Sequence, residues 1–138
     1  MEKTKKYAYP AIFYPENDGR YSVIFPDLND LATYGSDFVD AFDMAQEACA
    51  MYLFESLRDG ESFPVPTPIN KIFVEEDDAI INMVLVDLQS YARLHSDKSV
   101  KKTLSIPAWL STACDRRSLN YSKVLQEALI EKLQQNQQ

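Results

Sequence analysis

The sequence has 138 residues, of which 46% are hydrophobic and 25% charged, and its formal net charge at pH 7 is −7. This balance is typical of a globular chain of one domain or two small ones and excludes wholesale disorder. No apolar run has the length of a signal peptide or a membrane span, so we expect a soluble cytoplasmic protein. Cys49 and Cys114 lie far apart without metal-ligand spacing and predict buried free thiols, and no cofactor or metal is expected.

The charge is unevenly distributed along the chain. Residues 1–95 contain 7 Lys and Arg against 17 Asp and Glu, whereas residues 96–138 contain 7 against 4. Such an asymmetry suggests two parts with different partners. Solubility alone also explains an acidic domain, and a solvated helix face also explains a mildly basic tail.

The chain begins with the pattern of a β-hairpin followed by a helix. YAYPAIFY at 7–14 and RYSVIF at 20–25 are β-prone and flank the turn sequence ENDG. PDLNDLATYGS at 26–36 predicts a loop, after which Ser36 or Asp37 can cap a helix from about 37 to 58. Apolar residues recur there at steps of three and four, which predicts that one face packs on a core.

Two further strands complete the expected first unit. FPVPTP at 63–68 predicts an extended connector, whereas INKIFV at 69–74 and AIINMVLVDL at 79–88 predict strands. The expected fold class is therefore α+β, with a ββαββ antiparallel sheet and one helix in residues 1–92. The pattern is lost over 89–100, which predicts a hinge at 93–100.

A second unit is expected over 101–138. KKTLSI alternates like a strand, with Lys102, Leu104 and Ile106 on one face and Lys101, Thr103 and Ser105 on the other. Pro107 suits the first turn of a helix of about ten residues. Asn120 is a good N-cap for a second helix from 121 to about 135, and the QQNQQ sequence at the end predicts a polar, frayed tail.

This second unit is too small to bury an adequate core alone, and its single strand has no partner within it. A two-fold dimer remedies both defects, because two strands then pair as an antiparallel ribbon and four helices share a core. A two-stranded ribbon fits the DNA major groove, and free backbone N–H groups at Tyr121 and Ser122 can bind a phosphate. An ordinary edge strand with solubilising lysines is the alternative.

The layout of residues 101–134 resembles the ribbon-helix-helix repressors, with Pro107 at the strand-to-helix junction. The resemblance implies base contacts from Lys101, Thr103 and Ser105. It implies phosphate contacts around the start of the second helix, from Asn120, Tyr121, Ser122 and Lys123. Lys102 departs from the pattern, because these families often have an apolar residue there.

The first unit resembles the HicB antitoxin family. The motifs are Tyr9-Pro10-Ala11, Phe25-Pro26-Asp27-Leu28, Thr33 with Gly35, and Asp40-Ala41, in that order, although Asn29-Asp30 replace the usual Pro-Gly. The resemblance implies a partial ribonuclease H-like fold and a type II toxin–antitoxin system. Its N-terminal domain would occlude a small basic HicA-like ribonuclease toxin. Its C-terminal domain would dimerise, as a dimer or dimer of dimers, and repress the operon by binding double-stranded operator DNA.

The toxin-binding residues are expected among the acidic side chains of the hairpin turn and the corner loop. We assign Glu16, Asp18, Asp27 and Asp30 to this role, because carboxylates suit a cationic RNA-binding partner. The EEDD run at 75–78 competes for it.

Two other functions compete with the antitoxin hypothesis. One is a ribbon-helix-helix transcriptional regulator that senses a small ligand and has no toxin partner. The other is a metal-dependent nuclease that uses Asp27, Asp40 and Asp87, but the many acidic residues allow any such trio. His95 lies in the expected hinge, which is typical of a surface histidine and not of a catalytic base, so we expect neither catalytic residues nor an enzyme.

Overall fold

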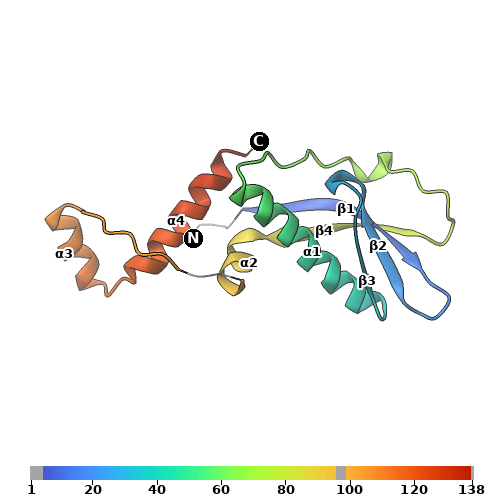
Figure 1. Ribbon diagram of the computed structural model, residues 1–138, viewed down its shortest axis with the longest axis horizontal. Helices are drawn as coiled ribbons and strands as arrows, with labels where there is room; N and C mark the ends of the chain where they lie inside the picture. Colours follow the sequence, from blue (N-terminus) through green and yellow to red (C-terminus); the bar gives the residue numbers. More distant parts are fainter. Residues whose placement is uncertain (1–4, 96–98, 138) are drawn as a thin grey trace.

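The structure is a computed structural model that describes residues 5–95 and 99–137. Its four strands form one antiparallel sheet in the order β3-β2-β1-β4 (Figure 1). The strands are β1 (Lys6–Pro15), β2 (Tyr21–Phe25), β3 (Leu31–Gly35) and β4 (Ile80–Asp87). The α-helices are α1 (Phe38–Arg58), α2 (Leu88–Leu94), α3 (Ala108–Arg116) and α4 (Tyr121–Gln135). Among these, no helix combines the length and apolar character needed to cross a membrane.

The expected hairpin and long helix are confirmed. Strands β1 and β2 pair in the register Phe13↔Val23, and the turn between them carries Gly19 at φ 88°. Asp37 caps α1, because its side chain accepts a hydrogen bond from the backbone N–H of Asp40. The α+β class is thus correct.

The position of the third strand was wrong. Residues 31–35, which were expected in a loop, form β3 and pair with β2 along its whole length. The short 3₁₀ turn η1 (Pro26–Leu28) and the left-handed residues Asn29 and Asp30 reverse the chain between the two strands. Polar turn residues therefore indicated a tight connection, not a long loop.

The strand expected at 69–74 is absent. A 3₁₀ turn, η2 (Ile69–Lys71), begins after Pro68, and no ladder pairing involves this segment. The prolines at 64, 66 and 68 stop a regular strand from starting, and β1 already has β2 and β4 as its two neighbours. The unit accordingly runs β-β-β-α-β along the chain and not ββαββ.

Helix α2 occupies the first half of the segment 89–100, where the sequence pattern was lost, and it extends into the expected hinge at 93 and 94. The Asp87 side chain caps it by accepting hydrogen bonds from the backbone N–H groups of Gln89 and Ser90. Leu88, Gln89 and Ala92 are buried, a helical spacing that the short length of the segment concealed. Residues 96–98 of the expected hinge lie outside the described residues.

The sheet has an inner face, which α1 covers, and an outer face, which no helix covers. Tyr9, Phe13, Val23 and Val84 on the inner face form one buried core with Cys49 and the other inward residues of α1. Burial raises the pKa of the Cys49 thiol to about 12. The alternate positions form the outer face: Lys6, Ala8, Pro10, Ile12, Tyr14, Ser22, Ile24, Ala32, Tyr34, Ile81, Met83, Leu85 and Asp87.

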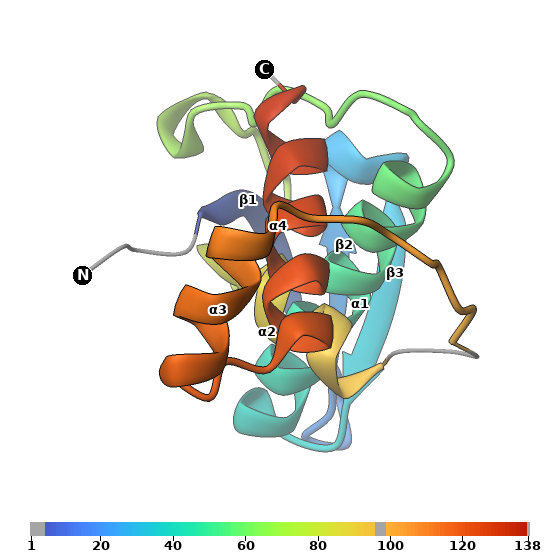
Figure 2. The ribbon, with the colours of Figure 1, turned by 90° about the vertical axis from the view of Figure 1, so that its left-hand side faces the viewer.

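The C-terminal helices lie beside this unit. Helix α3 is at the far end of the molecule, away from the sheet, whereas α4 packs next to α2 (Figures 1 and 2). Ile130 of α4 packs against the core of the first unit.

The polar end of the chain is not a frayed tail. Gln134 is 2% exposed, and the Gln137 side chain accepts a hydrogen bond from the Phe63 N–H at 2.7 Å and donates one to the Glu61 carbonyl at 3.0 Å. The composition of QQNQQ did not reveal these hydrogen bonds. A glutamine amide both donates and accepts hydrogen bonds, so it can bind water or the backbone N–H and C=O groups of another segment equally well.

Candidate functional site

The segment expected to read DNA is fully exposed. Residues 99–107 form neither helix nor strand, and Lys101, Thr103 and Ser105 all face solvent. A strand ladder needs a second strand, and the described part of this single chain provides none for 101–106. The ribbon therefore stays a prediction about a dimer.

The C-terminal unit leaves most of its apolar side chains uncovered. Helix α3 has no buried residue, and α4 has only Gln134. The exposed apolar residues of this unit are Val100, Leu104, Ile106, Trp109, Leu119, Val124, Leu125, Leu129 and Leu133. An apolar surface of this extent on such a small unit is typical of an interface with another chain.

The N-terminus of α4 has the expected cap. The Asn120 side chain accepts a hydrogen bond from the backbone N–H of Lys123 at 3.1 Å. The backbone N–H groups of Tyr121 and Ser122 have no acceptor in the part of the chain that the structure describes. These two groups and the Lys123 ammonium are therefore available to an anion.

The Tyr121 side chain has a different role from the one assigned to it. Its hydroxyl donates to the Asp115 carboxylate and lies 3.1 Å from the Ser111 carbonyl, so it ties α4 to α3. The hydrogen bond to Asp115 raises the pKa of Tyr121. A phosphate contact at this residue can come only from its backbone N–H.

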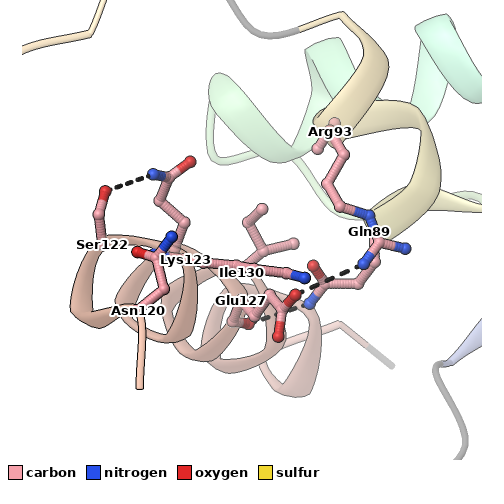
Figure 3. Close-up of a pocket in the computed structure, with 9 residues that line it drawn as sticks. Gln89, Arg93, Asn120, Ser122, Lys123, Glu127 and Ile130 are labelled. Atoms are coloured by element: carbon pink, nitrogen blue, oxygen red, sulfur yellow. Dashed lines mark hydrogen bonds and ion pairs between the residues drawn. The ribbon is translucent and has the colours of Figure 1, made fainter. Parts of the chain in front are cut away.

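A pocket lies between the start of α4 and α2 (Figure 3). Gln89 donates a hydrogen bond to the Glu127 carbonyl at 3.0 Å, and Arg93 lies 3.4 Å from the Glu127 carboxylate. Lys123 and Ser122 line the other side. Arg93 is the first residue of the expected hinge, so nothing in the sequence placed it near the start of α4.

The four carboxylates assigned to toxin binding do not form one cluster. Glu16 and Asp18 lie in the hairpin turn before β2, where Asp18 pairs with Arg20. Asp27 and Asp30 lie after β2, at the opposite end of the strand. The Asp27 carboxylate accepts hydrogen bonds from the N–H and the hydroxyl of Thr67, both at 2.7 Å, and thereby holds the connector.

The carboxylates of the nuclease hypothesis also have separate local roles. Asp27 binds Thr67, Asp40 accepts from Ser36, and Asp87 caps α2. No group of metal-ligating side chains comes together among the described residues. His95 stacks on the Tyr91 ring and lies 3.8 Å from the Glu47 carboxylate at the end of α2.

The outer sheet face is the feature that the sequence analysis missed. An antiparallel sheet with one solvated face normally alternates apolar and polar residues. Here the strand sequences YAYPAIFY and IINMVLV are apolar at almost every position, so both faces are apolar. The absence of alternation in these strand sequences could have predicted an apolar outer face.

Comparisons with known proteins agree on one family. A family model described as HicB-like antitoxin of bacterial toxin-antitoxin system matches residues 9–132. "Antitoxin HicB 1" of Photorhabdus laumondii is 29% identical over 82 residues, which cover 59% of this chain and 53% of that protein. Antitoxin HicB of Escherichia coli K12 is 29% identical over 80 residues, which cover 56% and 58%. The chain thus spans between half and three-fifths of the length of these curated relatives.

Two solved structures resemble the whole chain. A chain of a toxin-antitoxin complex from Streptococcus pneumoniae is 30% identical with a TM-score of 0.61, and the match covers 93% of this chain and 99% of that one. The antitoxin HicB of Burkholderia pseudomallei has a TM-score of 0.53 at 21% identity, over 94% and 98% of the two chains. The second likeness concerns the fold alone.

Proposed function

The chain belongs to the family of HicB-like antitoxins of bacterial toxin-antitoxin systems, and from this premise we propose that it neutralises a small ribonuclease toxin of the HicA class. The match of the family model over residues 9–132 carries the proposal, since it spans both units. The S. pneumoniae relative, whose structure is that of a toxin-antitoxin complex, supports a toxin as partner. The family is one of antitoxins and not of known enzymes, in agreement with the expectation that this chain is not an enzyme.

The first unit binds the toxin and occludes the surface that contacts RNA. A ribonuclease needs lysine and arginine side chains to bind the phosphates of its substrate. The acidic first unit complements such a surface and steers the two proteins together.

The second unit dimerises and binds operator DNA. Two copies of the 101–106 segment pair as an antiparallel ribbon, and the exposed apolar residues of α3 and α4 form the shared core of four helices. Lys101, Thr103 and Ser105 then contact base edges in the major groove. The start of α4 binds a phosphate through the backbone N–H groups of Tyr121 and Ser122 and through Lys123.

Co-expression with the small basic protein encoded beside this chain tests the proposal. We expect the two proteins to co-purify as a complex and growth to recover when both are present. If the toxin stays active and the proteins do not co-purify, the chain is not its antitoxin.

A further inference from the structure

The outer face of the sheet is apolar across all four strands. In register, Ile81, Ile12, Ile24 and Ala32 form one row across the sheet, and Met83 beside Pro10 forms the next. Ile12 and Pro10 at the centre of these rows are already buried, so the exposed apolar side chains of the face lie around them. Apart from the tyrosine hydroxyls, the polar residues at outer-face positions are Ser22 and the pair Lys6 and Asp87, which lies at the end of the sheet formed by the start of β1 and the end of β4. Tyr34 is 63% exposed at one edge of the face and Leu85 48% exposed at the other. Apolar residues on a sheet face that no helix covers indicate a partner.

One end of this face carries a concentration of carboxylates. The hairpin turn contributes Glu16 and Asp18, and the turn before β4 contributes the four acidic residues at 75–78. Both turns lie at the same end of the sheet, because Phe13 near the end of β1 pairs with Ile80 at the start of β4 (Figure 1).

One hydrogen bond and one electrostatic effect place carboxylates of this group beside the outer face itself. The Glu16 carboxylate accepts a hydrogen bond from the Ser22 hydroxyl at 2.8 Å. Burial and, after it, the negative charge of Glu76 raise the pKa of Tyr14. In this group of residues Arg20 is the only cation, and Asp18 pairs with it at 2.6 Å.

We propose that the outer face, with its acidic end, is the docking surface for the toxin and covers the toxin's basic RNA-binding surface. This inference rests on the proposed function and identifies the site that performs it. The apolar rows bury against apolar side chains of the toxin, and the six carboxylates at 16, 18 and 75–78 meet its lysines and arginines. Apolar burial supplies most of the affinity, and the charges supply association rate and selectivity.

Electrostatics favours the toxin over a second copy of this chain as the occupant. If two copies met through their outer faces, each would bring an acidic end to the interface. Like charges that face each other at an interface repel and oppose the gain from apolar contacts. If the partner is a basic protein, the same carboxylates attract its lysine and arginine side chains.

Arginine substitutions on the face provide the test. The full chain and a catalytically inactive form of the neighbouring toxin are mixed, and binding is measured by calorimetry. We expect Tyr34→Arg and Leu85→Arg each to weaken toxin binding by tenfold or more, since each places a cation against a basic surface. Tyr34→Ala and Leu85→Ala should weaken toxin binding less. If an arginine variant does not fold, the toxin affinity of the corresponding alanine variant tests the proposal instead.

Matched controls lie on α1, on the other side of the sheet. Val39 is 70% exposed and Met51 is 44% exposed, close to the values of Tyr34 and Leu85. Val39→Arg and Met51→Arg should change toxin affinity by less than twofold. Circular dichroism of each variant checks its folding, and a gel shift with operator DNA checks its C-terminal unit.

The outcomes separate the two proposals. If wild-type chain does not bind the toxin, the proposed function fails and the docking surface fails with it. If wild-type chain binds the toxin but the Tyr34 and Leu85 variants bind equally well, only the docking surface is wrong. A lower sedimentation mass of these variants at unchanged toxin affinity would show that the face joins two copies of the chain, which also overturns the proposal.

Discussion

Gly35 occupies a position where the backbone of α1 crosses the end of β3. A Cβ atom at this position would lie 2.1 Å from the backbone nitrogen of Ala41, and backbone cannot move aside as a flexible side chain can. Gly19 differs, because its φ of 88° favours glycine but a Cβ there would meet nothing within 4 Å. Glycine is thus required at position 35 because there is no space for a side chain, and it is favoured at position 19 because of the backbone conformation.

We predict that Gly35→Ala lowers the free energy of unfolding by about 3 kcal/mol, because β3 and the first turn of α1 must move apart. Gly19→Ala should cost only about 1 kcal/mol, the strain of a left-handed alanine. Urea unfolding of both variants measures the difference. Equal costs would mean that the approach of α1 to β3 is looser than the structure shows.

Thr103 and Ser105 are small exposed side chains without a structural role in the described chain. We predict that Thr103→Ala combined with Ser105→Ala reduces the preference for operator over random DNA about tenfold or more, because each lost base contact is worth roughly 1–3 kcal/mol. Toxin binding should be unchanged. Gel shifts on both DNAs measure the ratio, with the exposed Ser62→Ala as control, and an unchanged ratio removes these residues from base recognition.

The start of α4 combines a structural cap with a candidate phosphate site, and substitutions at Asn120 separate the two. Asn120→Ala should destabilise the helix by about 1 kcal/mol, because the Lys123 N–H loses its acceptor. Asn120→Asp keeps the cap but places a negative charge where a phosphate is expected. Its stability should therefore stay near wild type.

We predict that Asn120→Asp weakens binding to all DNA sequences by roughly tenfold, since like charges at contact distance repel by about 1 kcal/mol or more even in water. Gel shifts at two salt concentrations measure the effect, which should shrink as salt rises. Asn120→Ser keeps a cap without the charge and serves as control. Equal affinity of the Asp and Ser variants would place the phosphate elsewhere.

Elements with strong local signals were predictable from the sequence. The hairpin turn, the Asp37 and Asn120 caps and the periodicity of α1 and α4 each depend on near neighbours. β3 and the segment at 69–74 were not predictable, because ladder pairing depends on which strand lies alongside. Helix α2 was missed because seven residues give too little periodicity.

The site was predictable only in part, because some of its features depend on near neighbours in the sequence and others on how the strands pair. Sequence reasoning assigned the DNA-facing residues from alternation and a helix cap, which are local signals, and this assignment stays a prediction. It chose the four carboxylates assigned to toxin binding by loop position, and the structure puts them at two ends of β2. The apolar outer face arises from the register of four strands, which no single segment reveals.

At the scale of the whole molecule, a single chain does not bury all of its apolar side chains. Its first unit has a closed core, whereas its second unit exposes side chains such as Leu125 and Leu129. In the proposed dimer a second copy covers these side chains, so dimerisation and folding of the second unit become one equilibrium.

We predict that the unfolding midpoint rises with protein concentration. Leu129→Ala should lower the free energy of unfolding by about 2–5 kcal/mol, the cost of truncating a core leucine, although this residue is exposed in the single chain. Leu94→Ala, on a residue that is also exposed, should change it by about 0.5 kcal/mol or less. Thermal melts over a hundredfold range of protein concentration measure the midpoint shift and the effects of the two substitutions. A small effect of Leu129→Ala would contradict the four-helix core.

The contacts of Gln137 also bear on the order in which the protein is made and folded. They join residues separated by 74 and 76 positions, whereas the sheet is complete once β4 has been synthesised. N-terminal domains generally fold first as a chain emerges from the ribosome. The first unit can therefore form during translation, with the groups at 61 and 63 unpaired until Gln137 has been synthesised. A nascent chain would then present the unit proposed to bind the toxin before the unit proposed to bind DNA is in place.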